Sequence, residues 1–223
     1  MTPGSDPAPR PAAAERTPRQ NRVTPFGALI AVESRGTLMG NRGCLHDDQQ
    51  RIRRPFACKR WITCVLEFRG RYRTVMTPGR YTELFFLDEA TALAAGHRPC
   101  AECQHARYRL FREAWAEANA ELIGGSSLSA DEIDRVLHAE RVDDRRGKRT
   151  YLARVSELPS GAMIADDEGV PYLVHGQRLL RWEPGGYGRS IPKPGGIVSV
   201  LTPKSIVRAI GQGYPVMTLS SAG

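Results

Sequence analysis

Hydrophobic and polar positions alternate along the first third of the chain in a way that predicts short β-strands. Residues 26–32 have the pattern of one strand, 34–37 of a tight turn, and Leu38-Met39 of the returning strand. Residues 61–68 alternate again, a glycine turn follows, and 71–76 has the pattern of a partner strand. We therefore expect a β-hairpin over residues 61–76.

The middle of the chain has helical periodicity. Asp88 suits the N-cap of a helix that ends at a glycine, 88–96, and a longer helix is expected from about 101 to 123. One face of the longer helix is apolar and contains Phe111, Trp115, Ala118 and Leu122. A capping-box pattern at 129–132 predicts one more helix.

Short strands separated by glycine and proline turns dominate the last third. The expected strands are 151–155, 163–165, 172–174, 178–182 and 197–201, followed by a short helix at 204–210. This pattern predicts an α+β chain whose C-terminal module is β-rich and resembles a small barrel. We divide the chain into a disordered tail (1–22), an N-terminal module (23–125), a linker helix (126–150) and the β-rich module (151–219).

Charge adds a functional expectation to this outline. The net charge of +8 and the isoelectric point near 9.6 favour polyanionic partners, although a general preference for arginine would give the same excess. The distribution favours DNA or RNA, because residues 51–73 hold eight basic side chains against the single acid Glu67. The predicted phosphate contacts are Arg53, Arg54, Lys59, Arg60, Arg71, Arg73, Arg98 and Arg107.

Several classes of function receive no support from the sequence. No apolar run approaches the length of a membrane span, and the N-terminus lacks a signal-peptide pattern, so we expect a cytoplasmic protein. Neither a phosphate-binding Gly-x-x-x-x-Gly-Lys loop nor a strand-flanked dinucleotide motif occurs. The odd number of cysteines, five, argues against a disulfide framework and favours a metal or core packing.

A Cys-x-x-Cys step at Cys100 and Cys103 is the clearest chemical signal. This spacing commonly directs two thiolates to one zinc ion at a helix start, with inert thiols and a redox pair as alternatives. For the other ligands we favour Cys44 and Cys58, with His46 as a substitute for either. We expect Cys64 to be a small buried residue, because alternation places it on the apolar face of its strand.

The residues around this step resemble the closing half of the Ada-type metal-binding domain, over roughly residues 38–105. The similar positions are Gly40-Asn41 and His46 in the opening half and Phe86, Ala90, Ala95-Gly96, Arg98-Pro99-Cys100 and Cys103 in the closing half. The resemblance implies bound Zn²⁺ in module 23–125. In that family a zinc-bound thiolate of an upstream Cys-x-x-x-Cys pair accepts a methyl group from DNA, and this chain lacks that pair.

The sequence thus predicts a zinc-containing nucleic-acid-binding protein, linked to DNA repair or regulation. One alternative is an enzyme on DNA, either a thiolate methyl acceptor or a metal-dependent nuclease that uses His46, Asp47 and Asp48. Another is a protein-interaction module whose zinc is structural.

Overall fold

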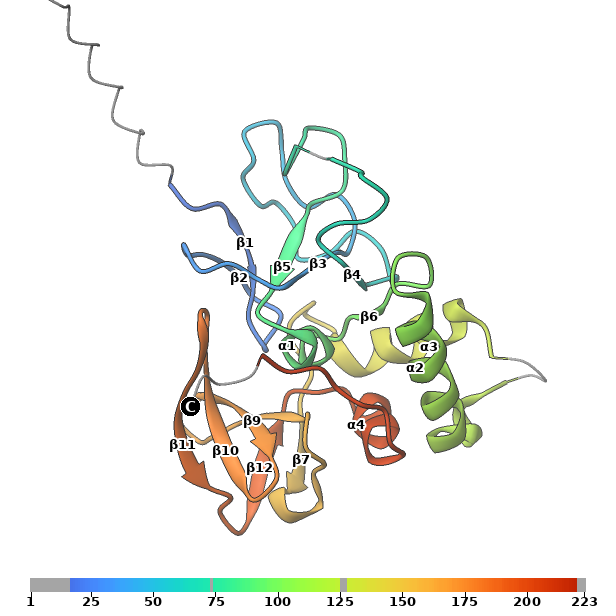
Figure 1. Cartoon of the computed structure of the whole chain (residues 1–223), viewed down its shortest axis with the longest axis vertical. Helices are drawn as coiled ribbons and strands as arrows, with labels where there is room; N and C mark the ends of the chain where they lie inside the picture. The colour runs from blue at the N-terminus through green and yellow to red at the C-terminus, as the bar shows by residue number, and fades with distance from the viewer. Residues whose placement is uncertain (1–16, 73, 125–127, 220–223) are drawn as a thin grey trace, which may run out of the picture.

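The computed structural model describes residues 17–72, 74–124 and 128–219 and confirms the α+β class. Two six-stranded sheets lie at opposite ends of the molecule, with helices beside and between them (Figure 1). No helix within these ranges is long and apolar enough to cross a membrane.

The N-terminal sheet has the strand order β2-β1-β5-β3-β4-β6. Its strands are β1 (Gln20–Val23), β2 (Leu29–Ala31), β3 (Leu38–Asn41), β4 (Ile62–Cys64), β5 (Leu84–Phe86) and β6 (Arg98–Pro99). Alternate side chains of β3 and β5 turn inward, so that Leu38, Leu84 and Phe86 pack into one core cluster. Strand β1 begins inside the predicted tail, whose residues 1–16 lie outside the described ranges.

The predicted basic hairpin does not form in the described part of residues 61–76. Only Ile62–Cys64 is a strand, and the described residues of 71–76 contain none. The reason is that both edges of β4 are occupied, by β3 in antiparallel and by β6 in parallel orientation. The basic residues of this stretch therefore lie on loops.

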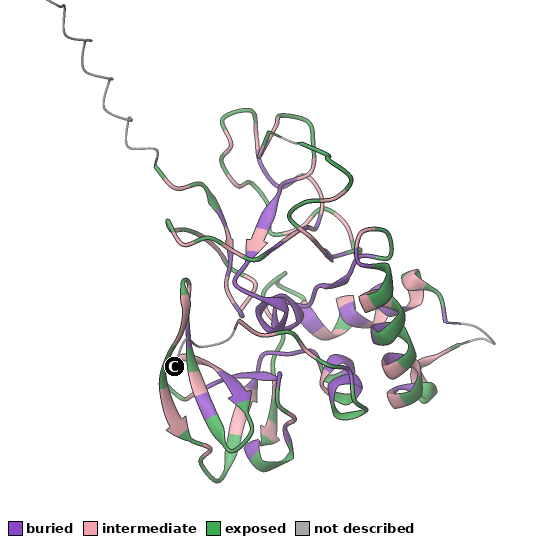
Figure 2. Ribbon diagram, viewed as in Figure 1, coloured by how far each residue is buried: buried purple, intermediate pink, exposed green. Residues whose placement is uncertain are grey.

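Helix α1 (Glu89–Ala94) lies between the two sheets and is buried along its whole length (Figure 2). Its predicted cap is confirmed, because Asp88 Oδ1 accepts a hydrogen bond from the Thr91 amide at 2.9 Å. Glu89, although charged, is only 1% exposed. A fully buried helix with two acids at its start needs donors from elsewhere in the chain.

Strand β11 (Gly186–Pro192) and the segment after helix α4 (Lys204–Gly211) supply such donors. Tyr187 Oη donates to Asp88 Oδ2 at 2.7 Å, and the Leu219 amide donates to the same oxygen at 3.0 Å. The Met217 amide donates to Glu89 Oε2 at 2.8 Å, and Tyr214 Oη donates to Glu89 Oε1. Helix α1 thus ties the N-terminal sheet to the last part of the chain.

The remaining helices are α2 (His105–Ala118), η1 (Ala120–Leu122), α3 (Ala130–Arg141) and α4 (Lys204–Gly211). The predicted apolar face of α2 is confirmed for Phe111 and Trp115, which are fully buried. The capping box at Ser129 and Glu132 is also present. Helix α2 begins later than predicted, because residues 101–104 form a turn instead.

The second sheet has the order β11-β10-β9-β8-β12-β7. Its strands are β7 (Tyr151–Arg154), β8 (Met163–Ala165), β9 (Pro171–His175), β10 (Arg178–Glu183), β11 (Gly186–Pro192) and β12 (Ile197–Val200), with η2 (Val155–Glu157) after β7. The five predicted strands are confirmed to within a residue or two. Strand β11 was not predicted, since its glycines and polar residues give no alternation and its backbone pairing with β10 forms it.

Candidate metal centre and basic groove

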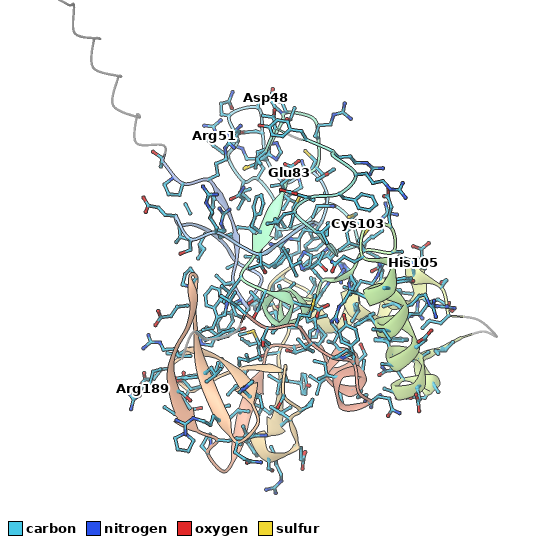
Figure 3. The ribbon with its side chains drawn as sticks, viewed as in Figure 1. Asp48, Arg51, Glu83, Cys103, His105 and Arg189 are labelled. Atoms are coloured by element: carbon cyan, nitrogen blue, oxygen red, sulfur yellow. The ribbon has the colours of Figure 1, made fainter. Side chains whose placement is uncertain are left out.

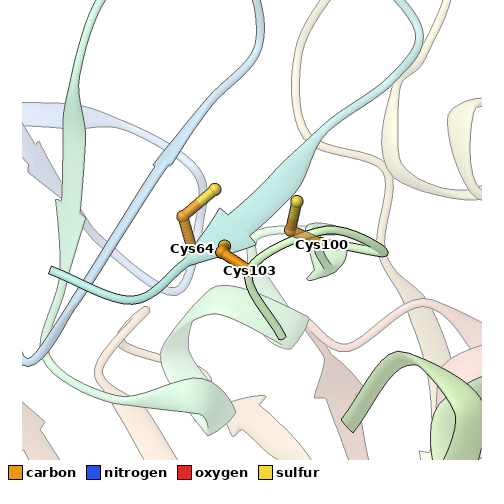
Figure 4. A group of neighbouring side chains, drawn as sticks. All are labelled: Cys64, Cys100 and Cys103. Carbon is orange, nitrogen blue, oxygen red and sulfur yellow. The ribbon is translucent and has the colours of Figure 1, made fainter. Parts of the chain in front are cut away.

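Strand pairing brings Cys64 and Cys100 together. Strands β4 and β6 run parallel, with Ile62 opposite Arg98 and Thr63 opposite Pro99. The same register places the next residues, Cys64 and Cys100, side by side, and the Cys100 amide donates to the Thr63 carbonyl at 2.9 Å. Two cysteines that are far apart in the sequence therefore meet at the end of one strand pair (Figure 4).

The turn after β6 adds the third cysteine. The Gln104 amide donates to the Cys100 carbonyl at 3.1 Å, which closes a turn over residues 100–104. The Gln104 side chain, 6% exposed, donates to the Thr63 carbonyl at 2.9 Å. These bonds fasten the turn to β4, and Cys103 consequently lies beside Cys64 (Figure 4).

The sulfur atoms of Cys64, Cys100 and Cys103 all lie within 4.8 Å of one another. In a tetrahedral zinc site with Zn–S bonds of about 2.3 Å, neighbouring sulfurs are about 3.8 Å apart. A small contraction would bring the three sulfurs to that distance. The triad is thus able to hold one metal ion through three thiolates.

The protonation of the triad follows from its hydrogen bonds. A hydrogen bond from Cys64 lowers the pKa of Cys100 to about 5. The same hydrogen bond, together with burial, raises the pKa of Cys64 far above its ordinary value. Burial raises the pKa of Cys103. Without metal, the triad at neutral pH therefore consists of one thiolate and two thiols. A metal must displace the two protons, so its affinity falls as pH falls.

A cavity of about 450 Å³ adjoins the triad, and all three cysteines are on its wall. Most of the other wall residues are apolar: Met39, Ile62, Val65, Leu66, Phe68, Tyr72, Val75 and Phe85. Two acids, Glu83 and Glu102, also line the cavity, and both have hydrogen-bond partners. Figure 3 labels Glu83 together with Cys103 of the triad. Glu83 accepts from the Met76 amide at 2.7 Å, and Glu102 pairs with Arg71 at 2.9 Å.

The proposed upstream ligands have other positions. Cys44 and Cys58 do not belong to the cysteine group, and their thiols donate to the carbonyls of His46 and Arg60. Both ring nitrogens of His46 are engaged, Nδ1 with Thr82 Oγ1 at 2.6 Å and Nε2 with the Thr77 carbonyl at 3.2 Å. The structure thus brings together two of the five predicted metal ligands, Cys100 and Cys103.

The expectation for Cys64 is wrong, because this residue is half-buried and belongs to the cysteine group. The alternation of residues 61–68 suggested an apolar face for a strand that in fact ends at Cys64. Cys64 could have been identified as a ligand only from the pairing of β4 with Arg98–Pro99, the two residues before Cys100. This pairing cannot be read from the sequence, because a strand of two residues has no periodic pattern.

Several predicted phosphate contacts pair with acids in the structure. Arg98 is 2% exposed and donates to both Asp134 oxygens, at 2.9 and 2.7 Å. Arg107 binds Glu89, Arg71 binds Glu102, and Arg53 binds Asp47 at 2.8 Å. Arg73 lies outside the described residues.

Asp47, one of the residues of the nuclease alternative, also has a structural role. One carboxylate oxygen accepts from the amides of Gln49 and Arg51, and the other accepts from the side chains of Arg51 and Arg53. These bonds lower the pKa of Asp47 to about 2, with the Arg51 amide as the largest cause. The bonds close the loop, as expected for an Asp that caps a turn.

A basic groove contains two of the other predicted contacts, Arg54 and Lys59. The groove has a volume of about 690 Å³ and is lined by Arg53, Arg54, Pro55, Phe56, Ala57, Cys58, Lys59, His138 and Arg146, with no carboxylate among them. Arg54 and Lys59 are exposed, and Arg60 is exposed next to them in the chain. Arg146 lies over the Phe56 ring, 4.2 Å from its centroid. Arg146, which lies in the loop after α3, was not among the predicted contacts.

Comparisons with known proteins provide no further guide, since no family model, curated protein or solved structure matches the chain. The structure supports one part of the Ada-type resemblance: three cysteines lie close enough together to bind a metal.

Proposed function

We propose that this chain is a zinc protein that binds nucleic acid through the basic groove. The observation that carries the proposal is the lining of the groove, which contains four cationic side chains and no carboxylate. One of the four, Arg53, is paired with Asp47, which lies outside the lining. A groove of this kind attracts a phosphate backbone, because each neutralised phosphate releases condensed counterions.

Zinc is the metal that the donor set favours. Three thiolates form a soft site that is typical of zinc, and the Cys-x-x-Cys turn is a common source of two of them. Bound zinc would hold the three sulfurs as thiolates and would fasten β4 to the turn after β6. Since thiolates oxidise readily, a reducing compartment such as the cytoplasm suits this site.

Groove substitutions should weaken binding of a DNA or RNA duplex regardless of its sequence. For the double variant Arg54→Ala/Lys59→Ala, we expect the slope of log affinity against log salt to decrease by about 1–2, since up to two phosphate contacts are lost. Fluorescence anisotropy with a labelled duplex at several salt concentrations measures this slope. Arg189→Ala is the matched control, because Arg189 is exposed on β11 of the second sheet (Figure 3) and does not line the groove.

The same titration separates the competing class, a protein-interaction module with a structural zinc. That class predicts no salt-dependent binding of nucleic acid by the zinc-loaded wild type. Equal losses in the groove variant and in Arg189→Ala would show general charge attraction and would reject the groove.

A second candidate function is supported by the cavity beside the triad. Three thiolates leave one position of a tetrahedral metal free. The three cysteines line the cavity of about 450 Å³, so this cavity adjoins the metal site. A triad thiolate there could attack the methyl carbon of a methylated DNA phosphate. The S–C bond forms as the C–O bond breaks, and the electron pair leaves with the phosphodiester oxygen.

This candidate predicts a stable covalent change. Zinc-loaded protein incubated with DNA that contains methyl phosphotriesters should gain the mass of one methyl group on a peptide that contains Cys64, Cys100 or Cys103. Intact-mass and peptide mass spectrometry measure it, and unmethylated DNA is the control. An unchanged mass, or a methyl group on Cys44 or Cys58, would exclude the triad as acceptor.

A further inference from the structure

A second cavity adjoins the basic groove, and three cationic side chains line it in addition to Arg146, which it shares with the groove. Arg42 follows β3, Arg141 ends α3, and Lys148 lies in the loop after α3; all three line this cavity. Arg42 and Arg141 are 2% and 1% exposed and face the Trp61 ring, with their guanidinium carbons 4.7 and 4.0 Å from its centroid. Cations buried in this way normally have a paired anion.

No such anion is found in the described part of the chain. None of its salt bridges includes Arg42, Arg141 or Lys148. Asp134 is the acid whose charge acts on Arg141, and both of its oxygens are bound by Arg98. The three cations instead donate to backbone carbonyls, those of Gly27, Gly96, Lys59 and Ala94.

Unused donors remain in the same place. The Nε atoms of Arg42 and Arg141 are buried and have no hydrogen-bond partner among the described residues. The neighbouring His97 is fully buried, and both of its ring nitrogens are likewise without a partner there. Buried donors without partners are rare in folded proteins and call for a ligand or water.

The pKa values of the three basic side chains are lowered, which reflects the electrostatic cost of burying their charges together. Burial lowers the pKa of Arg42 to about 10 and that of Arg141 to about 9. Burial, with repulsion by Arg141 and Arg42, lowers the pKa of Lys148 to about 7. A negative charge placed among the three groups would oppose each of these shifts.

The size of the cavity restricts what it can hold. Its volume is about 50 Å³. One water needs about 10–15 Å³ on this measure, so the space suits a few waters or one small ion better than an organic molecule. The cavity shares Pro55, Phe56 and Arg146 with the basic groove, so the two spaces are adjacent.

We propose that this cavity binds a small tetrahedral oxyanion of the phosphate class, held by Arg42, Arg141 and Lys148. The anion supplies acceptors to the unused Nε donors and compensates the buried positive charge. Two sources share this chemistry: free inorganic phosphate, and the terminal phosphate of a nucleic-acid strand that enters from the groove. The first source does not require the proposed function.

The test is the melting temperature of the full chain, loaded with zinc, in phosphate and in chloride at equal ionic strength. Phosphate at ten times its dissociation constant should raise the melting temperature of the wild type by about 3–6 °C. Lys148→Met should lose most of this shift. We choose Lys148 because it is only half-buried, whereas Arg42 and Arg141 are almost fully buried against the Trp61 ring, so that their replacement endangers folding. Lys204→Met, which removes an exposed lysine at the start of α4, should keep the full shift.

Three results would overturn the proposal: no shift in the wild type with either inorganic phosphate or the 5′-phosphorylated oligonucleotide, an equal shift in Lys148→Met, or a shift lost in Arg54→Ala and kept in Lys148→Met. The last result would place the ion in the groove. A 5′-phosphorylated oligonucleotide, compared with its unphosphorylated form, distinguishes the two sources. A Lys148-dependent shift that needs the 5′-phosphate indicates the strand terminus, and a shift with inorganic phosphate alone indicates the free ion; both results support the site.

Discussion

Replacement of Asp134 by alanine should destabilise the protein by about 3–5 kcal/mol. Asp134 and Arg98 form a bidentate pair in which both side chains are almost completely buried, 4% and 2% exposed. Loss of the carboxylate leaves the Arg98 guanidinium buried without a counter-charge, which costs more than the pair itself contributes. Arg98 forms half of β6, so the disturbance reaches the turn that contains Cys100 and Cys103.

Urea denaturation at constant pH, with and without zinc, measures this change in the free energy of unfolding. The matched control is Asp131→Ala, which removes an exposed acid from the first turn of the same helix and should cost at most about 1 kcal/mol. The double variant Arg98→Met/Asp134→Leu should recover much of the stability, since it removes both charges. A loss in Asp134→Ala no larger than in the control would show that the pair does not anchor α3 to the sheet.

Loss of any one triad cysteine should abolish stoichiometric zinc binding. Outer-shell substitutions typically weaken a metal site about 10–100-fold, and removal of one of three protein ligands should exceed that. We therefore expect Cys64→Ala, Cys100→Ala and Cys103→Ala to purify without zinc and to show no rise in melting temperature when zinc is added. Elemental analysis and calorimetric zinc titration provide the measurements.

Cys44→Ala and Cys58→Ala are the matched controls, because each removes a half-buried cysteine outside the triad. Both should retain one zinc per chain. Zinc lost from these two variants and kept in Cys64→Ala would instead support the ligand set expected from the sequence.

Local patterns predicted the elements that local interactions form. Asp88 accepts from an amide within the same helix turn, and Ser129 and Glu132 form a capping box within four residues. The strands β7 to β10 and β12 follow short alternating runs bounded by turns. Strand β11 depends on backbone pairing with its neighbour, and such pairing leaves no trace in side-chain periodicity.

The candidate site was harder to predict because long-range pairing forms it. Cys64 joins Cys100 only through the parallel register of β4 and β6, while Arg98 and Arg107 meet acids at Asp134 and Glu89. A count of basic residues cannot tell an arginine in an interior ion pair from one at the surface. The same count did lead to Arg54 and Lys59, since a loop rich in exposed cations needs no distant partner to form a basic surface.

The burial of α1 limits how the protein can be dissected. Asp88 and Glu89 accept hydrogen bonds from residues 187–219, so a cut within 126–150 would leave two buried carboxylates without those donors. The fragment with the triad and the fragment with the second sheet would each lose part of a shared interior. Assignment of activities to the two halves therefore calls for point substitutions in the intact chain, or for both fragments expressed together, and not for isolated truncations.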